Sequence, residues 1–397
     1  MKAPLKPLGL YIHIPFCKQK CVYCDFYSLP RSESRMDDYV DALCAHLTET
    51  APFAAGHLVD TVYFGGGTPS CLGEKRLVKI LKTIAKRYQV SREAEITLEA
   101  NPDSAGDWKA LKALRKAGFN RISLGMQSAC DQELQSIGRI HTMAQVRQAV
   151  EAARKAKFDN LSLDLIYGLP GQTRQRWMEN LAAAVDLAPE HLSCYGLKVE
   201  EGTPLYERRE SAGLPDDGQQ ADMYLYAVAY LAQLGYGQYE ISNFAKDGFA
   251  SRHNLKYWTL GEYAGFGPGA HSDFGNVRYG YVRDLEGYIR GELVLSETES
   301  VPPPERDMEY IMLTLRTTAG IDRRGFENRF RERFAPLEEK FVLYEQHGLA
   351  ARTANGWRLT PKGFLVSNRI IGELQDALTR EKARRLAEAA RGNYRIV

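Results

Sequence analysis

Six short apolar runs alternate with amphipathic stretches in the first half of the chain. The runs are LGLYIHI, DTVYFGG, EITLEAN, RISLGMQ, LSLDLIYG and HLSCYGLK, between Leu8 and about Leu197. Most gaps between them have helical periodicity, over Asp37–Thr50, Glu74–Tyr88, Asp107–Ala117, Met143–Lys157 and Thr173–Leu187. Strands that alternate with helices in this way predict a parallel sheet with helical crossovers. No Gly-x-Gly-x-x-Gly motif opens the first helix, so we expect a partial (β/α)6 barrel of the TIM type instead of a dinucleotide-binding fold.

Polar or glycine-rich residues stand at the ends of five of these runs. In (β/α) barrels the chemistry lies at the carboxyl ends of the strands, so these segments are expected to share one rim. They are a cysteine cluster, GGGTPS (65–70), EANPD (99–103), GMQS (125–128) and the stretch DLIYGLPGQT that begins at Asp164. Any one of them is explained by turn chemistry alone. Five on one rim predict a functional site.

Consecutive prolines with flanking charges at Glu299–Asp307 indicate a linker. We therefore expect a barrel over residues 1–235, an accessory segment over 236–300 and a C-terminal domain over 301–397. The last part reads as a helix, a hairpin with ANG at its tip and a second helix, which resembles a winged helix and makes this domain α+β. It has no evident basic recognition helix and the net charge is only +2, so we favour packing or partner docking over nucleic-acid binding.

The composition is that of an ordinary soluble protein, with 44% hydrophobic and 26% charged residues among 397. No apolar run approaches the roughly 20 residues that span a bilayer, and the first residues lack the apolar segment of a signal peptide. We expect a cytoplasmic protein whose contact with membranes is at most peripheral.

Three of the seven cysteines, Cys17, Cys21 and Cys24, form a C-x3-C-x2-C pattern. In a reducing compartment such a cluster indicates a metal site or catalysis more than disulfides. A structural zinc site takes four protein ligands, usually from paired C-x2-C units, and there is no second pair here. Three thiolates on a [4Fe–4S] cluster leave one iron open to a small molecule.

With an aromatic residue, Tyr23, beside its last cysteine, this pattern resembles the signature of the radical S-adenosylmethionine (SAM) superfamily. In that superfamily the open iron binds the amino and carboxylate groups of SAM, whose reductive cleavage gives a 5'-deoxyadenosyl radical. YIHIPFC, GGGTPS, EANPD, GMQS…GRIH and DLIYGLPGQT are similar to segments of the oxygen-independent coproporphyrinogen III oxidase group, HemN and its relatives. The resemblance implies a SAM pocket made of Tyr11, Gly66, Gly67, Thr68, Glu99, Gln127, Arg139 and Asp164.

Two features resemble the heme chaperone branch of that group, HemW. Phe26 stands where the oxidases have a fourth cysteine, and HNLKYW at His253–Trp258 matches the H-N-x-x-Y-W motif of the branch. The resemblance implies a heme site at His253, Tyr257 and Trp258, because imidazole is a common axial ligand of heme iron and aromatic rings pack on a porphyrin. His271, in GAHS, is a less specific candidate whose default role is structural.

These resemblances imply a heme chaperone that carries a [4Fe–4S] cluster and a SAM site. Its partners would be heme and heme-accepting proteins, with an electron-transfer chain protein as the expected acceptor and a homodimer as an open possibility. The alternative is an enzyme that decarboxylates coproporphyrinogen III to protoporphyrinogen IX, which the intact SAM pocket favours and Phe26 disfavours. Whether SAM is cleaved stays open. No C-x-x-C-H motif for covalent heme attachment is present.

Overall fold

The computed structural model describes residues 4–393, which form two compact units. The first combines the chain up to Gly237 with Ser242–Lys256 and Gly261–Ser300. The second takes the chain from Val301 onward together with Gln238–Ile241 and Tyr257–Leu260. No helix among residues 4–393 combines the length and the apolar character needed to cross a bilayer.

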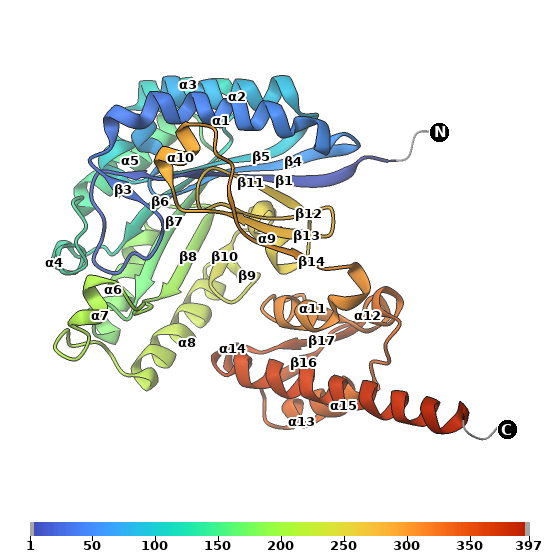
Figure 1. Ribbon diagram of the computed structural model, residues 1–397. Helices are drawn as coiled ribbons and strands as arrows, with labels where there is room; N and C mark the ends of the chain where they lie inside the picture. Colours follow the sequence, from blue (N-terminus) through green and yellow to red (C-terminus); the bar gives the residue numbers. More distant parts are fainter. Residues whose placement is uncertain (1–3, 394–397) are drawn as a thin grey trace. The chain divides into compact units, whose positions relative to one another are not determined.

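Six parallel strands in sequence order form the centre of a twelve-stranded sheet in the first unit (Figure 1). They are β1 (Lys6–Ile14), β4 (His57–Gly66), β5 (Val90–Ala100), β6 (Arg121–Gln127), β7 (Asn160–Tyr167) and β8 (His191–Gly196). The predicted β/α array is therefore confirmed. The array is open, because in the sheet order β1 and β8 are each followed by further strands instead of by each other.

Shorter strands extend both sides of this array. Beyond β1 lie β11 (Tyr263–Phe266), β12 (His271–Phe274), β13 (Val277–Tyr281) and β14 (Leu295–Ser300). Beyond β8 lie β10 (Asn243–Ala245) and β9 (Gly237–Gln238), and a separate small pair joins β2 (Phe16–Cys17) to β3 (Leu29–Pro30). Strand β11 runs parallel to β1, whereas each of β12, β13 and β14 runs antiparallel to the strand before it.

The crossover helices begin and end within two residues of the predicted bounds. They are α1 (Met36–Thr50), α2 (Glu74–Arg87), α3 (Trp108–Ala117), α5 (Met143–Lys155) and α6 (Arg174–Val185). Each buries one apolar stripe; on α2 this stripe is Leu77, Ile80, Leu81 and Ile84, at helical spacing. Figure 1 shows α1, α2 and α3 side by side along the sheet. Four further helices are α4 (Asp131–Ser136), α7 (Pro204–Glu207), α8 (Asp217–Gln233) and α10 (Leu285–Ile289).

The two faces of the sheet differ in chemistry. On β1 the fully buried Leu8, Leu10, Ile12 and Ile14 join the core that includes the apolar stripes of the helices. The alternate residues Gly9, Tyr11 and His13 lie on the opposite face, because successive side chains of a strand point to opposite sides. We call this opposite face the inner face. It carries the candidate site.

The second unit is built on the antiparallel strands β15 (Ile321–Asp322), β16 (Ala350–Arg352) and β17 (Gly356–Leu359). Its helices are α11 (Asp307–Thr314), α12 (Arg323–Phe330), α13 (Ala335–Gln346), α14 (Pro361–Leu365) and α15 (Ser367–Asn393). Phe341 stacks on Trp357 with ring centroids 5.4 Å apart, and both are buried. Aromatic packing of this kind gives a small domain a core of its own.

Candidate functional site

The three clustered cysteines lie on the loop that follows β1. Cys17 ends β2, and Cys21 and Cys24 follow it; all three are free thiols. Burial is the main cause that raises the pKa of the Cys17 thiol, and the nearby Cys24 and Cys21 raise it further. No three His, Cys, Asp or Glu side chains in residues 4–393 already surround a point as metal ligands do. Three neighbouring free thiols still match the donor set of a [4Fe–4S] cluster.

Contacts from distant segments hold both ends of this loop. The backbone N–H of Val22 donates to Ile137 O at 3.2 Å, and Lys18 Nζ lies 2.8 Å from an Asp103 oxygen. After the cysteines, Tyr27 O lies 3.0 Å from His13 Nε2. The loop is therefore held between its cysteines, at Lys18 and Val22, and again after the last cysteine, at Tyr27.

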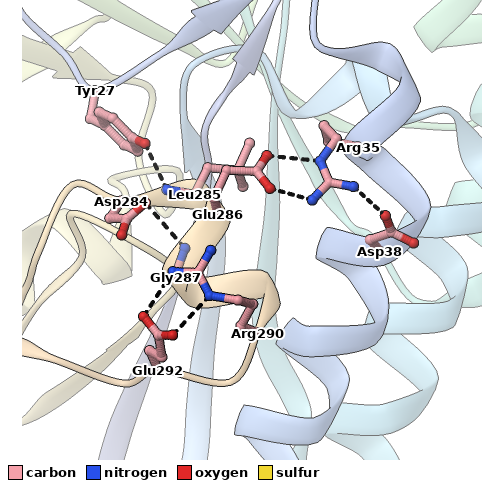
Figure 2. A network of polar contacts seen from close by, with 9 residues as sticks. All are labelled: Tyr27, Arg35, Asp38, Asp284, Leu285, Glu286, Gly287, Arg290 and Glu292. Carbon is pink, nitrogen blue, oxygen red and sulfur yellow. Dashed lines mark hydrogen bonds and ion pairs between the residues drawn. The ribbon is translucent and has the colours of Figure 1, made fainter.

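Figure 2 shows how the accessory segment joins this loop to α1. The backbone N–H of Leu285, at the start of α10, donates to the Tyr27 hydroxyl at 3.0 Å. The next residue, Glu286, accepts from Arg35 Nε at 2.8 Å, and Arg35 also pairs with Asp38 on α1. These ion pairs are exposed and contribute little to stability individually, on the order of 1 kcal/mol or less. Their effect is to fix α10 beside the segment that follows the cysteines.

The glycines of GGGTPS bring backbone against the cysteine segment. The N–H of Gly67 donates to Ile14 O at 2.8 Å, and that of Thr68 donates to Phe16 O at 2.7 Å. A Cβ on Gly67 would stand 2.5 Å from Phe16 O, so no larger residue fits there. Gly66 has a φ of +108°, a conformation that glycine adopts without strain. Gly66, Gly67 and Thr68 are thereby placed next to Cys17.

Glu99 is a buried carboxyl at the carboxyl end of β5. Burial raises its pKa to about 7, although a hydrogen bond from the Tyr63 hydroxyl, 2.6 Å long, opposes the rise. The predicted SAM residue Tyr11 is its neighbour: a Cβ on Gly65 would stand 3.2 Å from both Glu99 Oε2 and Tyr11 Cε2. Tyr63 Cε1 would be closer still, at 2.9 Å, so the absence of a side chain at Gly65 lets these three side chains pack against the backbone.

Asp164, on β7, is held by hydroxyl donors. Ser123 Oγ lies 3.0 Å from each carboxylate oxygen, and Ser162 Oγ lies 3.3 Å from one of them. Burial raises the pKa of Asp164, while a hydrogen bond from Ser193, the nearby Arg121 guanidinium and the hydrogen bonds from Ser123 and Ser162 counteract it. Three serine donors and one cation stabilise the ionised form inside the sheet.

Arg139 and Gln127 lie together at the next part of the rim. A Cβ on Gly125 would stand 3.0 Å from Gln127 Nε2 and 3.7 Å from Arg139 Nη1. Arg139 donates from Nη1 to Asn101 Oδ1 at 2.9 Å and from Nη2 to the Tyr23 hydroxyl at 2.8 Å. This guanidinium therefore connects the polar rim to the cysteine loop. Gln127 has a φ of +62°, a strained conformation that is typical of functional positions.

Three partners of the predicted residues were missed by the motif reading: Tyr63, Asn101 and Ser123. Each stands two residues from a predicted or rim position on the same strand or strand end, so each lies on the inner face. Alternation along the strands was the signal that would have found them.

The HNLKYW segment forms the short helix α9 (Arg252–Trp258) at the opposite, amino-terminal side of the strands. Glu95 oxygens accept from the backbone N–H groups of Arg252 at 3.1 Å and His253 at 3.0 Å. Lys256 Nζ lies 2.8 Å from an oxygen of Asp60. A carboxylate at the first turn stabilises a helix, and here it seats α9 against the sheet.

His253 is fully buried, with 0% of its surface exposed. Its Nδ1 lies 2.8 Å from Thr61 Oγ1, and its ring stacks on Tyr63 with centroids 5.1 Å apart. Burial is the main cause that lowers its pKa to about 3. Tyr257 and Trp258 are half-buried on the same helix. The assignment of these three residues to heme stays a prediction.

His271 is in a different environment. Its side chain is 53% exposed, and its Nδ1 lies 3.0 Å from Glu297 Oε1. Its exposure leaves the imidazole accessible to solvent, and its role stays a prediction.

The chain matches the radical SAM superfamily over residues 11–184 and the HemN C-terminal domain over residues 301–366. It is 36% identical over 372 residues to the heme chaperone HemW of Bacillus subtilis, covering 91% of this chain and 97% of that one. It is 34% identical over 388 residues to the Escherichia coli heme chaperone HemW, covering 92% and 98%.

Among solved structures, coproporphyrinogen III oxidase (HemN) from Escherichia coli has a TM-score of 0.82 and 24% identity, over 94% of this chain and 91% of that one. That likeness establishes the fold. The two HemW relatives establish the family as well, because each aligns with this chain over nearly the whole length of both proteins at more than one third identity. With the free cysteine cluster, the glycine cradle and the carboxylates gathered on one rim, the chain belongs to the heme chaperone HemW family of the radical SAM superfamily.

Proposed function

We propose that this protein is a heme chaperone, which binds heme and delivers it to acceptor hemoproteins while carrying a [4Fe–4S] cluster and a SAM site. The observation that carries the proposal is the nearly full-length similarity to heme chaperones HemW from distant bacteria. Phe26, 60% exposed on the cysteine loop, supports it, because this chain offers a phenyl ring where the oxidase group has a thiol.

We further propose that Cys17, Cys21 and Cys24 hold the cluster. When bound, the cluster supplies an electron and an open coordination position for the amino and carboxylate groups of SAM. The eight pocket residues would surround the rest of SAM: Tyr11, Gly66, Gly67, Thr68, Glu99, Gln127, Arg139 and Asp164. Their positions support this, since the glycine segment is hydrogen-bonded to the backbone beside Cys17 and the polar groups lie at or just beyond the carboxyl ends of neighbouring strands.

Within this pocket the charged groups have chemically matched partners. An ionised carboxyl such as Glu99 or Asp164 accepts from the hydroxyl pair of a ribose, and the Arg139 guanidinium pairs with a carboxylate. The hydroxyl donors on Asp164 and the Tyr63 hydroxyl on Glu99 hold these carboxyls in place before a ligand arrives.

A second candidate is coproporphyrinogen III oxidation, which is favoured by the same intact pocket. It is the weaker candidate because of Phe26. For the chaperone, the proposed setting is the cytoplasm, the proposed acceptors are electron-transfer proteins, and a homodimer is a proposed assembly.

The deciding experiment is an anaerobic titration of cluster-reconstituted protein with heme, followed by the Soret band. Saturable binding, and transfer of the bound heme to an apo-hemoprotein, are expected. A parallel incubation with coproporphyrinogen III, SAM and reductant is expected to give no protoporphyrinogen IX. Product formation together with absent heme binding would reverse the order of the two candidates.

A further inference from the structure

Only two of the eight histidines are exposed, and this limits which of them can reach a heme. All eight lie within residues 4–393. His57 is half-buried, and the exposed pair is His271 and His347. The five buried histidines are His13, His46, His141, His191 and His253. An axial nitrogen must meet iron at the centre of a broad, rigid macrocycle, so an enclosed imidazole is blocked by its neighbours.

His253 illustrates this obstacle. The Nδ1 contact with Thr61 does not itself prevent ligation through Nε2, but a porphyrin would have to displace the Tyr63 ring stacked on this fully buried imidazole. A Cβ on Gly9 would stand 3.2 Å from His253 Cε1, so β1 also covers the ring. In this arrangement His253 seats α9 at the amino side of the sheet.

His271 occupies the inner face beside the SAM pocket. The strand registers place Tyr11, Gly265, His271, Gly280 and Glu297 in one row across β1, β11, β12, β13 and β14. With about 4.8 Å between strands, His271 lies about 10 Å from Tyr11 along the row. Both of its neighbours in the row are glycines, and a Cβ on Gly280 would stand 2.9 Å from the imidazole. The imidazole therefore lies over Gly280, whose missing side chain makes room for it, and still keeps 53% of its side-chain surface exposed.

Its hydrogen bonding fits a metal ligand. Nδ1 contacts the Glu297 carboxylate at 3.0 Å, which selects the tautomer that carries the proton on Nδ1. Nε2 has no hydrogen-bond partner among the described residues. Histidines that bind metals almost always donate their second ring N–H to a carboxylate or carbonyl, which orients the ring and raises its basicity.

Groups suited to the edge of a porphyrin lie close by. A Cβ on Gly269, two residues before His271, would stand 3.4 Å from Arg283 Cγ and 3.5 Å from Tyr27 Cβ. Arg283 is exposed and offers a guanidinium to a propionate. Tyr27 follows the exposed ring of Phe26 on the cysteine loop. His347, by contrast, lies in the second unit and has no carboxylate contact among the described residues.

We propose that His271, oriented by Glu297, is the axial ligand of heme iron on the inner face, and that Arg283 binds a heme propionate. This assignment rests on the proposed chaperone function and adds the residue that holds its cargo.

The test is a ferric heme titration of full-length, cluster-reconstituted His271→Ala, with His347→Ala as the matched exposed-histidine control. We expect His271→Ala to weaken heme binding at least tenfold and to shift the Soret maximum, and free imidazole to restore the wild-type spectrum. The control is expected to behave as wild type. Glu297→Gln, which retains the ligand and makes it less basic, is expected to raise the heme reduction potential.

The outcomes separate this assignment from the function itself. Saturable binding by wild type with an unchanged spectrum in His271→Ala would overturn the ligand and leave the chaperone intact. Loss of the spectrum in a folded His253→Asn variant, with retention in His271→Ala, would assign iron to the HNLKYW motif instead. Absence of saturable binding in wild type would reject both proposals.

Discussion

The two ends of the parallel strands are both polar, yet they satisfy their polar groups differently. At the amino end, His253 and Glu95 are matched by protein partners: a threonine hydroxyl, a stacked ring and two backbone N–H groups. At the carboxyl end, Arg139 Nε and Asp103 Oδ1 are buried without a hydrogen-bond partner among the described residues, and both residues contact the cysteine loop. At the amino end, His57 Nδ1 and Asn160 Oδ1 are also buried without a partner in residues 4–393, so incomplete bonding alone does not mark a ligand site.

This difference separates two kinds of motif residue. Residues such as His253 and Glu95, whose hydrogen bonds are completed by the protein, hold α9 against the sheet. The residues at the carboxyl end that lie beside the cysteine loop are the ones proposed to bind SAM. Variants at the two ends should therefore have different effects.

The largest effect is expected at the carboxyl end, from Cys21→Ser. Loss of one of three thiolates should abolish the cluster, because the loop has no fourth cysteine to replace it. Iron content and visible absorbance after anaerobic reconstitution measure this. Cys130→Ser, a half-buried free cysteine outside the loop, is the control and should reconstitute normally. A normal cluster in Cys21→Ser would remove this residue from the ligand set.

At the amino end, His253→Ala should lower the free energy of unfolding by about 3 kcal/mol, because it removes a buried ring, its stacking and a hydrogen bond. Denaturant unfolding measures the loss. Thr61→Val removes only the hydroxyl partner and should cost about 1 kcal/mol. If His253→Ala were as stable as wild type, the amino end would not have the structural role described.

A change of pH should act at the carboxyl end through Glu99. Its pKa of about 7 means that the carboxylate gains a proton as pH falls through that value, and the protonated group has less capacity to accept hydrogen bonds. SAM affinity should therefore drop about tenfold from about pH 8 to about pH 6. Isothermal titration measures it. In Glu99→Gln this pH dependence should disappear; its persistence would assign the titration to another group.

The smallest effect is expected from Tyr63→Phe, which keeps the ring between the two ends and removes the hydroxyl. The lost hydrogen bond stabilises the Glu99 carboxylate, so the midpoint of the SAM pH profile should move upward, with a change in affinity of a few-fold. The stability of the variant should fall by only about 1 kcal/mol. An unshifted midpoint would show that this hydroxyl does not tune Glu99.

Much of the array was predictable because its signals are local. The short apolar runs predicted the six parallel strands, and the helical stripes predicted the crossover helices, each within a few residues of its observed bounds. The rule that chemistry gathers at strand ends predicted a shared rim for the segments that contain Glu99 and Asp164, whereas Arg139 was named only from the family resemblance. The strands β11 to β14 gave no comparable signal, since they are only four to six residues long and β14 is exposed along its whole length.

Exposure could not be read from the motifs. HNLKYW and GAHS both contain one histidine, but the first is enclosed and the second is open. What encloses His253 is Glu95, Thr61 and Tyr63, residues that stand on strands far away in the sequence. Only the tertiary structure brings them together, so sequence spacing carries no information about it.

The anchoring of α9 by Glu95 also bears on the order in which the chain assembles. The two partners are separated by 158 positions, so the helix gains its carboxylate only after β5 has taken its place between β4 and β6. Contacts between residues this far apart form slowly, because the chain loses the entropy of closing a large loop before the contact stabilises it. A seven-residue helix is too short to persist alone in water. We therefore expect α9 to form late in folding, after the parallel strands around β5 have assembled.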